Sequence, residues 1–249
     1  MDATWWMFFG VGLLAQTIDG ALGMAFGVSA TTVMLAFGTS PAQASAMVHI
    51  AEIFTTAASG ASHAYHRNID WSIVRRLAIP GVIGGILGAT VLANVDGKTI
   101  EPFVSIYLGL MGVIILAKAL RKFRTMEPTR KGMPVVGFIG GLFDAIGGGG
   151  WGPIVSSTLL GGGHVPRFVI GSVNLTEFFV TVATSTTFAL SLGIADLAPV
   201  IPLILGGLVS APFAGYLVKI VPARYLMFAV GCLILILSSR SVLKAFGVV

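Results

Sequence analysis

Six long apolar stretches constrain this chain more than any other feature. They run over residues 41–62, 73–94, 100–120, 167–191, 197–218 and 223–244. A helix needs about 20 residues to cross the hydrocarbon core of a bilayer. Only 10% of the residues are charged and the mean hydropathy is +0.94, whereas a soluble domain carries about 25% charged residues. The sequence therefore predicts an all-α, polytopic membrane protein in contact with the lipid bilayer.

Two further apolar stretches are interrupted by an aspartate and glycines. Residues 4–38 break at 19–23, and residues 133–163 break at Asp144 and at 147–150. Each stretch then offers two pieces of about 12–16 residues, which are too short to span comfortably alone, so we expect half-helices or re-entrant hairpins. Non-helical backbone at membrane depth persists only where protein or a water-filled cavity satisfies its polar groups.

The two interruptions belong to an internal repeat. At an offset of 125 residues Asp19 aligns with Asp144 and Glu52 aligns with Glu177. Because the chain holds only 10 acidic residues, two acidic pairs at one offset are a specific signal. A shorter offset of 122 aligns the Ile-Pro and Gly-Gly pairs of residues 79–85 with those of residues 201–207. The sequence predicts a first repeat over residues 1–124 and a second over 133–249, joined by a cytoplasmic linker over 125–132.

The basic residues orient these halves. They gather in short segments, mainly 118–131 and 67–76, and the positive-inside rule places both segments in the cytoplasm. We therefore read the net charge of +5 as a topology signal and expect no nucleic acid partner. If the interrupted stretches dip in and return, the two halves are inverted, and if they cross, the halves are parallel. Inversion leaves slightly more Lys and Arg inside, so the sequence favours it.

Two of the long stretches carry polar residues at corresponding positions. Their spacing of three and four places each set on one helical face. A charged side chain at membrane depth costs at least roughly 2.5 kcal/mol and usually faces a cavity or a partner. The two stripes are Ser45, His49, Glu52 and Thr56 in the first half, and Asn174, Glu177, Thr181 and Thr184 in the second.

Different roles follow from these residue types. Glu52 and Glu177 are candidates for carrying a coupling proton, because burial can raise the pKa of a glutamate. Histidine is the side chain whose unperturbed titration lies near neutral pH. His49, Ser45, Asn174 and Thr181 are predicted to contact substrate. The alternative is that both glutamates are structural and bond to freed backbone groups or to each other.

Asp19 and Asp144 directly precede the glycine breaks. They could carry protons beside the substrate, or they could cap the half-helix that follows by accepting bonds from its backbone N–H groups. Both interpretations stay open, and they do not exclude each other. Gln16 lies three residues before Asp19 and is a further candidate for the same polar cluster.

The glycine run of residues 147–152 invites a phosphate-loop interpretation. That loop needs Lys and then Ser or Thr after its last glycine, and here Pro153 follows, which excludes nucleotide binding. The glycines instead predict a close approach of the backbone to a small anion or to another helix. The N–H groups of a half-helix amino terminus favour an anion. The glycines assigned to the substrate site are Gly23, Gly27, Gly148, Gly149, Gly150 and Gly152.

No resident metal or cofactor is expected. The single cysteine, Cys232, excludes a cysteine-based metal cluster. His63 and His66 are three residues apart but lack a third ligand, so we expect them at a solvated interface beside Arg67.

The repeated pattern resembles the sulfite exporter TauE/SafE family of membrane transporters. The resemblance lies in residues 12–27, followed by Pro41 and 45–62, and again in residues 137–153, followed by 171–177. It implies a carrier in the bacterial inner membrane for a small sulfur-containing anion such as sulfite, sulfoacetate or another organosulfonate. It also implies transport without ATP hydrolysis, driven by the proton or substrate gradient. The glycine-rich segments 19–27 and 144–152 are then close to the substrate.

Other functions remain as alternatives. A channel would need a continuous polar ring, whereas this chain offers paired polar residues. An intramembrane enzyme could use Asp19 and Asp144 as a carboxylate pair, and an importer of a different small organic solute is also open. An anion carrier should hold positive charge, yet the arginines fall near the ends of the spans. Half-helix dipoles, hydroxyl groups and protonated His49 would have to replace it, unless Arg167 reaches inward. The oligomeric state is not predicted.

Overall fold

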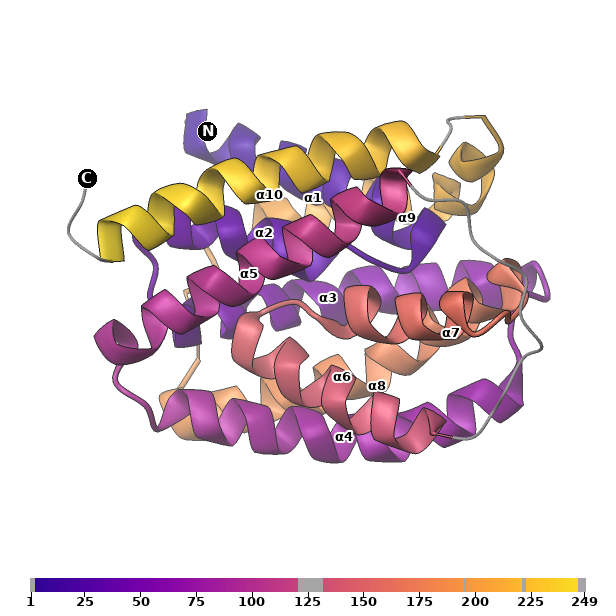
Figure 1. The fold of residues 1–249 in the computed structure, drawn as a ribbon, viewed down its shortest axis with the longest axis horizontal. Helices are drawn as coiled ribbons and strands as arrows, with labels where there is room; N and C mark the ends of the chain where they lie inside the picture. Colours follow the sequence, from indigo (N-terminus) through magenta and orange to yellow (C-terminus); the bar gives the residue numbers. More distant parts are fainter. Residues whose placement is uncertain (1–2, 121–131, 195, 221–222, 246–249) are drawn as a thin grey trace.

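The computed structural model describes residues 3–120, 132–194, 196–220 and 223–245, and every regular element within them is a helix (Figure 1). This confirms the predicted all-α class. Apart from Gly132, the predicted linker lies outside the described residues. In chain order the elements are α1 (Ala3–Leu22), α2 (Phe26–Ala36), α3 (Pro41–Tyr65), α4 (Trp71–Ala93), α5 (Gly97–Leu120), α6 (Met133–Gly147), the π-helical turn η1 (Gly152–Ser156), α7 (Ser157–Gly161), α8 (Pro166–Leu192), α9 (Val200–Ile220) and α10 (Ala223–Ala245).

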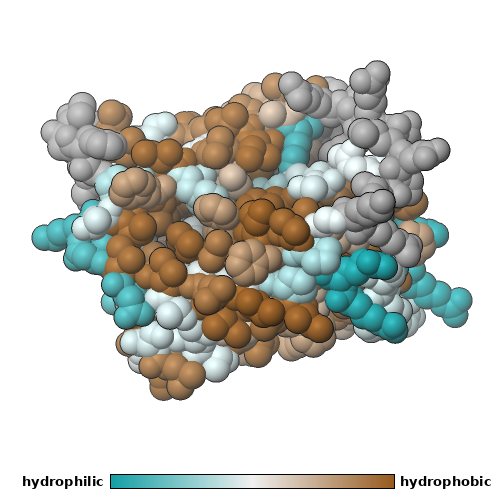
Figure 2. All heavy atoms as spheres, turned by 60° about the horizontal axis from the view of Figure 1, so that its bottom comes forward, coloured by the Kyte–Doolittle hydropathy of each residue, from teal (hydrophilic) through white to brown (hydrophobic). Residues whose placement is uncertain are grey.

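The six predicted apolar stretches correspond to α3, α4, α5, α8, α9 and α10. By length and composition, α4, α5 and α8 could each cross a membrane. The described parts of α9 and α10 contain shorter apolar windows, Val200–Phe213 and Met227–Leu243. A broad apolar surface lies between hydrophilic ends on the face drawn in Figure 2, as expected for a protein whose sides contact lipid.

Both interrupted stretches form helical hairpins. The first breaks between α1 and α2 at Gly23–Ala25, and the second breaks at Gly148–Gly150 between α6 and η1. The predicted length of about 12–16 residues is confirmed for α6, which has 15, and is wrong for α1, which has 20. Helix α2 has 11 residues, and η1 and α7, which follow each other directly, have 5 each. Helix α1 continues through Asp19 because its carbonyl accepts a bond from the Gly23 N–H, and the chain leaves the helix only where Gly23 adopts a φ of 64°.

The two hairpins open toward opposite ends of the molecule. Phe8 near the start of α1 contacts Phe37 at the end of α2, with ring centroids 6.2 Å apart. Phe37 also lines a cavity with Leu192, the last residue of α8. The second hairpin instead ends at the turn that leads into the start of α8 (Figure 1). Since α8 has 27 residues and a helix rises 1.5 Å per residue, the two openings lie about 40 Å apart.

Each hairpin is held by helices from the other part of the chain. Helix α1 packs along α9 and α6 packs along α4, while α3 lies against α8 and α5 against α10. Glycines permit these close contacts: Gly12 lies against the backbone of Leu203, and Gly84 lies against the carbonyl of Phe138. Small residues of this kind let helix backbones approach closely in membranes. The packing therefore fixes both hairpin breaks at the centre, beside α3 and α8.

Candidate functional site

The two hairpin breaks cross each other in the interior. Gly27 lies against the backbone of Gly149, and Gly152 lies against the backbone of Gly23 and Met24. A Cβ atom on any of these four glycines would overlap neighbouring atoms. The close approach predicted from the glycines is therefore present, and in this structure the partner of each hairpin is the other hairpin.

Hydroxyl groups satisfy the carbonyls that the breaks leave free. Thr31 of α2 donates a hydrogen bond to the Gly148 carbonyl, and Ser156 of η1 donates to the Gly23 carbonyl at 2.6 Å. Unpaired backbone groups are costly away from water, so these bonds stabilise both breaks. Both residues belong to hydroxyl-bearing segments that follow the breaks, where the sequence favours capping or helix contact over contact with a ligand. They lie 125 positions apart.

Asp144 caps the element that follows the second break. Its Oδ1 accepts hydrogen bonds from the Gly150 N–H at 2.7 Å and the Trp151 N–H at 2.9 Å. Asp19 accepts a bond from the backbone N–H of Phe26, and its Oδ2 has no hydrogen-bond partner among the described residues. The capping interpretation is thus confirmed for Asp144, and a role of either aspartate in proton transfer stays a prediction.

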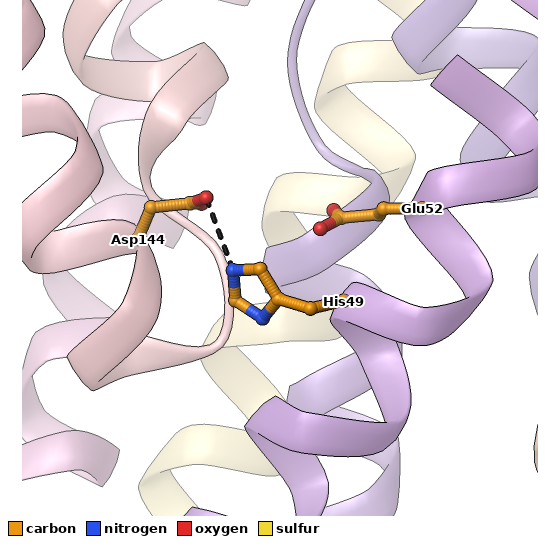
Figure 3. A group of neighbouring side chains, drawn as sticks. All are labelled: His49, Glu52 and Asp144. Carbon is orange, nitrogen blue, oxygen red and sulfur yellow. Dashed lines mark hydrogen bonds and ion pairs between the residues drawn. The ribbon is translucent and has the colours of Figure 1, made fainter. Parts of the chain in front are cut away.

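His49 joins α3 to the second hairpin. Its Nδ1 lies 2.8 Å from the Ser45 carbonyl, and its Nε2 lies 3.2 Å from Asp144 Oδ2 (Figure 3). The Ser45 hydroxyl donates to the carbonyl of Ala145 at 2.6 Å. His49 and Ser45 are fully buried and Asp144 is 1% exposed. The structure therefore brings together three of the residues predicted from the sequence.

Glu52 faces the same space. Its carboxylate points toward His49 and Asp144 in Figure 3, and one ligand atom from each of the three residues lies within 4.8 Å of the others. Glu52 Oε2 has no hydrogen-bond partner in the described part of the chain. Within the described part of the chain, these three side chains form the group that could hold a metal ion.

The polar residues on one face of α8 are buried as predicted. The uncharged side chains of Asn174 and Thr181 already make hydrogen bonds within the protein. Asn174 accepts a bond from Ser59 at 2.8 Å and donates to the Ile170 carbonyl at 3.0 Å. The Thr181 hydroxyl donates to the Phe178 carbonyl on its own helix. Glu177 Oε2 and both side-chain polar atoms of Gln16 have no partner among the described residues. These atoms are available to a ligand.

The site is strongly acidic. Its carboxyl groups, those of Asp19, Glu52, Asp144 and Glu177, are at most 4% exposed, and no lysine or arginine among the described residues is buried. The alternative in which Arg167 reaches inward is wrong, because this side chain is exposed and its guanidinium lies 4.5 Å from the Phe168 ring centroid. His49 is therefore the basic side chain that the described structure places in the site.

Two other residues differ from the sequence analysis. His63 is 7% exposed and its Nε2 lies 3.0 Å from the Gly20 carbonyl, so its assignment to a solvated interface was wrong, whereas His66 and Arg67 are exposed. Helix α3 continues to Tyr65, which keeps His63 within the packed bundle. Tyr107 was missed: its hydroxyl donates to the Gly149 carbonyl at 3.1 Å. A single tyrosine in an apolar span gives no signal of this role.

A cavity of about 590 Å³ approaches the site from one end. It is lined by the turn between α2 and α3 and by the end of α8, including Gln43, Met47, Gly193 and Asp196. A smaller hollow of about 220 Å³ beside it is lined by Ser185 and Phe188. The Phe188 ring lies 6.1 Å from the His49 ring, so Phe188 stands between this hollow and the site.

An apolar bundle with two broken hairpins that meet at a buried polar centre has the architecture of a multi-pass membrane transporter. Residues 8–241 match the family described as sulfite exporter TauE/SafE, and the chain belongs to this family. It is 41% identical over 247 residues to "Probable membrane transporter protein YtnM" of Bacillus subtilis (strain 168), covering 96% of this chain and 82% of that protein. No solved structure matches the chain. Membership assigns the chain to transporters and not to enzymes.

Proposed function

We propose that the chain is a secondary carrier that exports a small sulfur-containing anion, such as sulfite, sulfoacetate or another organosulfonate, across a bacterial inner membrane. It works by alternating access and couples the anion to protons. The observation that carries this proposal is the crossing of two broken hairpins at a buried polar centre. The sulfite exporter description of the family supports the substrate class.

Matching hydrogen bonds support two homologous halves, residues 1–124 and 133–249. An offset of 125 residues maps the bond from Thr31 to Gly148 onto the bond from Ser156 to Gly23, with donor and acceptor hairpins exchanged. The same offset maps the cap on Phe26 onto the cap on Trp151. Opposite openings of the two hairpins support an inverted relation between the halves. Inverted halves give two equivalent conformations that open to opposite sides.

Helices α4 and α9 support a different offset from the predicted one of 122. A Cβ on Gly81 would meet Trp151, and a Cβ on Gly207 would meet Phe26. Since Trp151 and Phe26 correspond at an offset of 125, Gly81 corresponds to Gly207 at an offset of 126. The Gly-Gly alignment drawn from the sequence is therefore replaced by one that the contacts support.

The acidic centre supports coupling to protons. Two unit charges 4 Å apart repel by about 1 kcal/mol in water and by about 4 kcal/mol at the effective dielectric near a protein surface. An anion beside four ionised carboxylates would meet several such repulsions. We infer that it binds while some of these groups are protonated, so that anion binding and proton binding are linked. The unpartnered amide of Gln16 supplies a neutral donor.

The cavity supports a carrier over a channel. It opens at the end of the molecule opposite the predicted cytoplasmic segments, and Phe188 closes the way from the adjoining hollow to His49. A centre whose described side chains are buried, with a cavity on one side, fits an outward-facing occluded stage of alternating access. A saturable flux with counterflow distinguishes this carrier from the channel alternative.

Ligand-dependent thermal stability tests the substrate class. Purified protein is heated with sulfite, sulfate, thiosulfate or a small sulfonate at two pH values, because a ligand of the folded state raises Tm by mass action. We expect stabilisation by a sulfur anion that is stronger at the lower pH, and we expect Glu177→Gln, which is uncharged at both pH values, to weaken this dependence on pH. The matched control is Glu101→Gln, a partly exposed glutamate of α5 outside the site. Stabilisation only by a neutral or cationic solute would contradict the proposal.

A further inference from the structure

Both ring nitrogens of His49 face oxygen atoms. Nδ1 lies 2.8 Å from the Ser45 carbonyl and Nε2 lies 3.2 Å from Asp144 Oδ2. A carbonyl oxygen only accepts hydrogen bonds, so Nδ1 must carry a hydrogen. The contact between Nε2 and the carboxyl group then needs a second hydrogen, on Nε2 or on Oδ2, because two lone pairs would otherwise face each other. The geometry of the pair therefore contains one dissociable proton.

We propose that this proton, held between His49 Nε2 and Asp144 Oδ2, is the coupling proton of the transport cycle; this assignment rests on the proposed function. When the proton leaves to water, neutral His49 keeps its Nδ1 hydrogen and Asp144 becomes a carboxylate. The Nε2 lone pair and the carboxylate then repel each other. Charge and atoms balance with a single proton released for each loss of this contact.

Loss of the same proton changes a contact between two helices. His49 is on α3 and Asp144 is on α6, so the proton joins the second hairpin to the central helix. Asp144 uses its other oxygen to cap Gly150 and Trp151, and that cap needs no proton. Deprotonation therefore removes this link between the hairpin and α3, while the bond from Ser45 to the Ala145 carbonyl and the cap on the break remain. Reprotonation restores the link.

The first hairpin has no equivalent pair. The position of His49 is taken by Asn174 in the second half, and a side-chain amide neither gains nor loses a proton as the pH changes. Asp19 accordingly lacks a titratable base at the corresponding place. The pair thus distinguishes the two hairpins, and it assigns the coupling proton to the second one.

The titratable groups around the pair come from several helices, and each of them is an acid. These groups are Asp19 on α1, Glu52 on α3, Tyr107 on α5 and Glu177 on α8.

A metal ion is the alternative to a proton at this place. One ligand atom from each of His49, Glu52 and Asp144 lies within 4.8 Å of the others. The distance of 3.2 Å between Nε2 and Oδ2, by contrast, is one that a single hydrogen bond spans.

Asp144→Asn separates the proton from the structure around it. An asparagine oxygen can still accept the two capping N–H bonds, and its NH₂ group can donate to Nε2 without a dissociable proton. The measurement is the ¹⁵N NMR spectrum of histidine-labelled protein in lipid nanodiscs as a function of pH, with His49 assigned by its loss in His49→Gln. In the native chain we expect Nε2 to titrate while Nδ1 stays protonated, and in Asp144→Asn we expect Nε2 to stay an acceptor over the range in which the native chain titrates.

Asp19→Asn is the matched comparison and should leave the Nε2 titration in place. An unchanged titration in Asp144→Asn would overturn the assignment. So would a metal ion that co-purifies with the native chain and is lost in Asp144→Asn. Neither readout needs a substrate, so it separates this assignment from the proposed function.

Transport gives the second readout. In proteoliposomes supplied with external labelled thiosulfate, whose charge is constant over the neutral range, a proton gradient should drive accumulation by the native chain. We expect Asp144→Asn to lower this accumulation by about tenfold or more and to make any remaining exchange independent of pH. Accumulation that still follows the gradient in Asp144→Asn would overturn the proposal. If no sulfur anion is moved by the native chain while Nε2 titrates as expected, the substrate class fails and the proton site stands.

Discussion

The first hairpin has Met24 and Ala25 where the second has Gly149 and Gly150, and the two breaks diverge from that point. Gly23 and Gly148 adopt nearly the same φ, 64° and 63°. After them the first chain passes through Ala25 at a φ of 108° and continues as α2, whereas the second passes through Gly149 at 156° and continues as a π-helical turn. The same opening can thus be followed by two different half-helices.

The acids at the two breaks differ in the same way. Asp144 has three partners, two capping N–H groups and His49. Asp19 accepts from the Phe26 N–H, and its other oxygen has no partner in the described structure. Asp144 therefore links the second hairpin to α3, whereas Asp19 leaves one oxygen unpartnered and the first hairpin contacts α3 through the Gly20 carbonyl and His63. We infer from this difference that the second break holds the coupling proton and that the first break contacts the ligand.

Exchange of the residues that distinguish the breaks should have the largest effect. A Cβ in Gly149→Ala would overlap the backbone of Gly27 and Val28, so we expect a loss above about 4 kcal/mol or failure to fold. Ala25→Gly should have the opposite sign and stabilise the fold by about 1 kcal/mol, because glycine adopts the positive φ of this position without the steric cost that alanine carries. Thermal unfolding in detergent measures both. If both substitutions changed the free energy of unfolding by the same amount in the same direction, the two breaks would not differ as described.

Removal of the two aspartates should give a smaller but unequal loss. We expect Asp144→Ala to cost about 3 kcal/mol, because two capping bonds and the contact with His49 disappear, and Asp19→Ala to cost about 1 kcal/mol. Chemical denaturation in mixed micelles measures the difference. A cost for Asp19→Ala as large as that for Asp144→Ala would show that the first break is fastened as firmly as the second.

The hydroxyl bonds between the hairpins should behave alike. Thr31→Val and Ser156→Ala each leave one break carbonyl without its donor, and each should cost about 1 kcal/mol. The same unfolding assay applies, and Thr158→Ala serves as a control because its exposed hydroxyl bonds within its own segment. A large effect in one variant and none in the other would contradict a reciprocal contact.

Much of this arrangement follows from the cost of polar groups in lipid. Because of that cost, the sequence predicts that Glu52 and Glu177 face inward. For the same reason it predicts hairpin breaks at Asp19 and Asp144. All four side chains are buried. The pairing of these groups could not be derived in the same way, because it depends on how two distant hairpins cross.

Three residues illustrate what the sequence leaves undetermined. His63 looked solvated because it lies near a helix end, yet α1 ends against it. Arg167 looked able to reach inward, but its side chain lies over Phe168 at the surface. Tyr107 contacts Gly149 only because α5 passes the second break. In each case the tertiary position of a neighbouring helix, and not local pattern, decides the role.

The sidedness of α3 and α8 tests the central claim that the hairpins enter from opposite sides. Gln43→Cys and Arg167→Cys place single cysteines at exposed positions near the starts of these helices, in a chain that also carries Cys232→Ser. A membrane-impermeant thiol reagent is applied to intact cells and to inverted membrane vesicles. Inverted halves predict that Gln43→Cys reacts only in cells and Arg167→Cys only in inverted vesicles. Reaction of both cysteines from the same side would mean that the interrupted segments cross the membrane and that the halves are parallel.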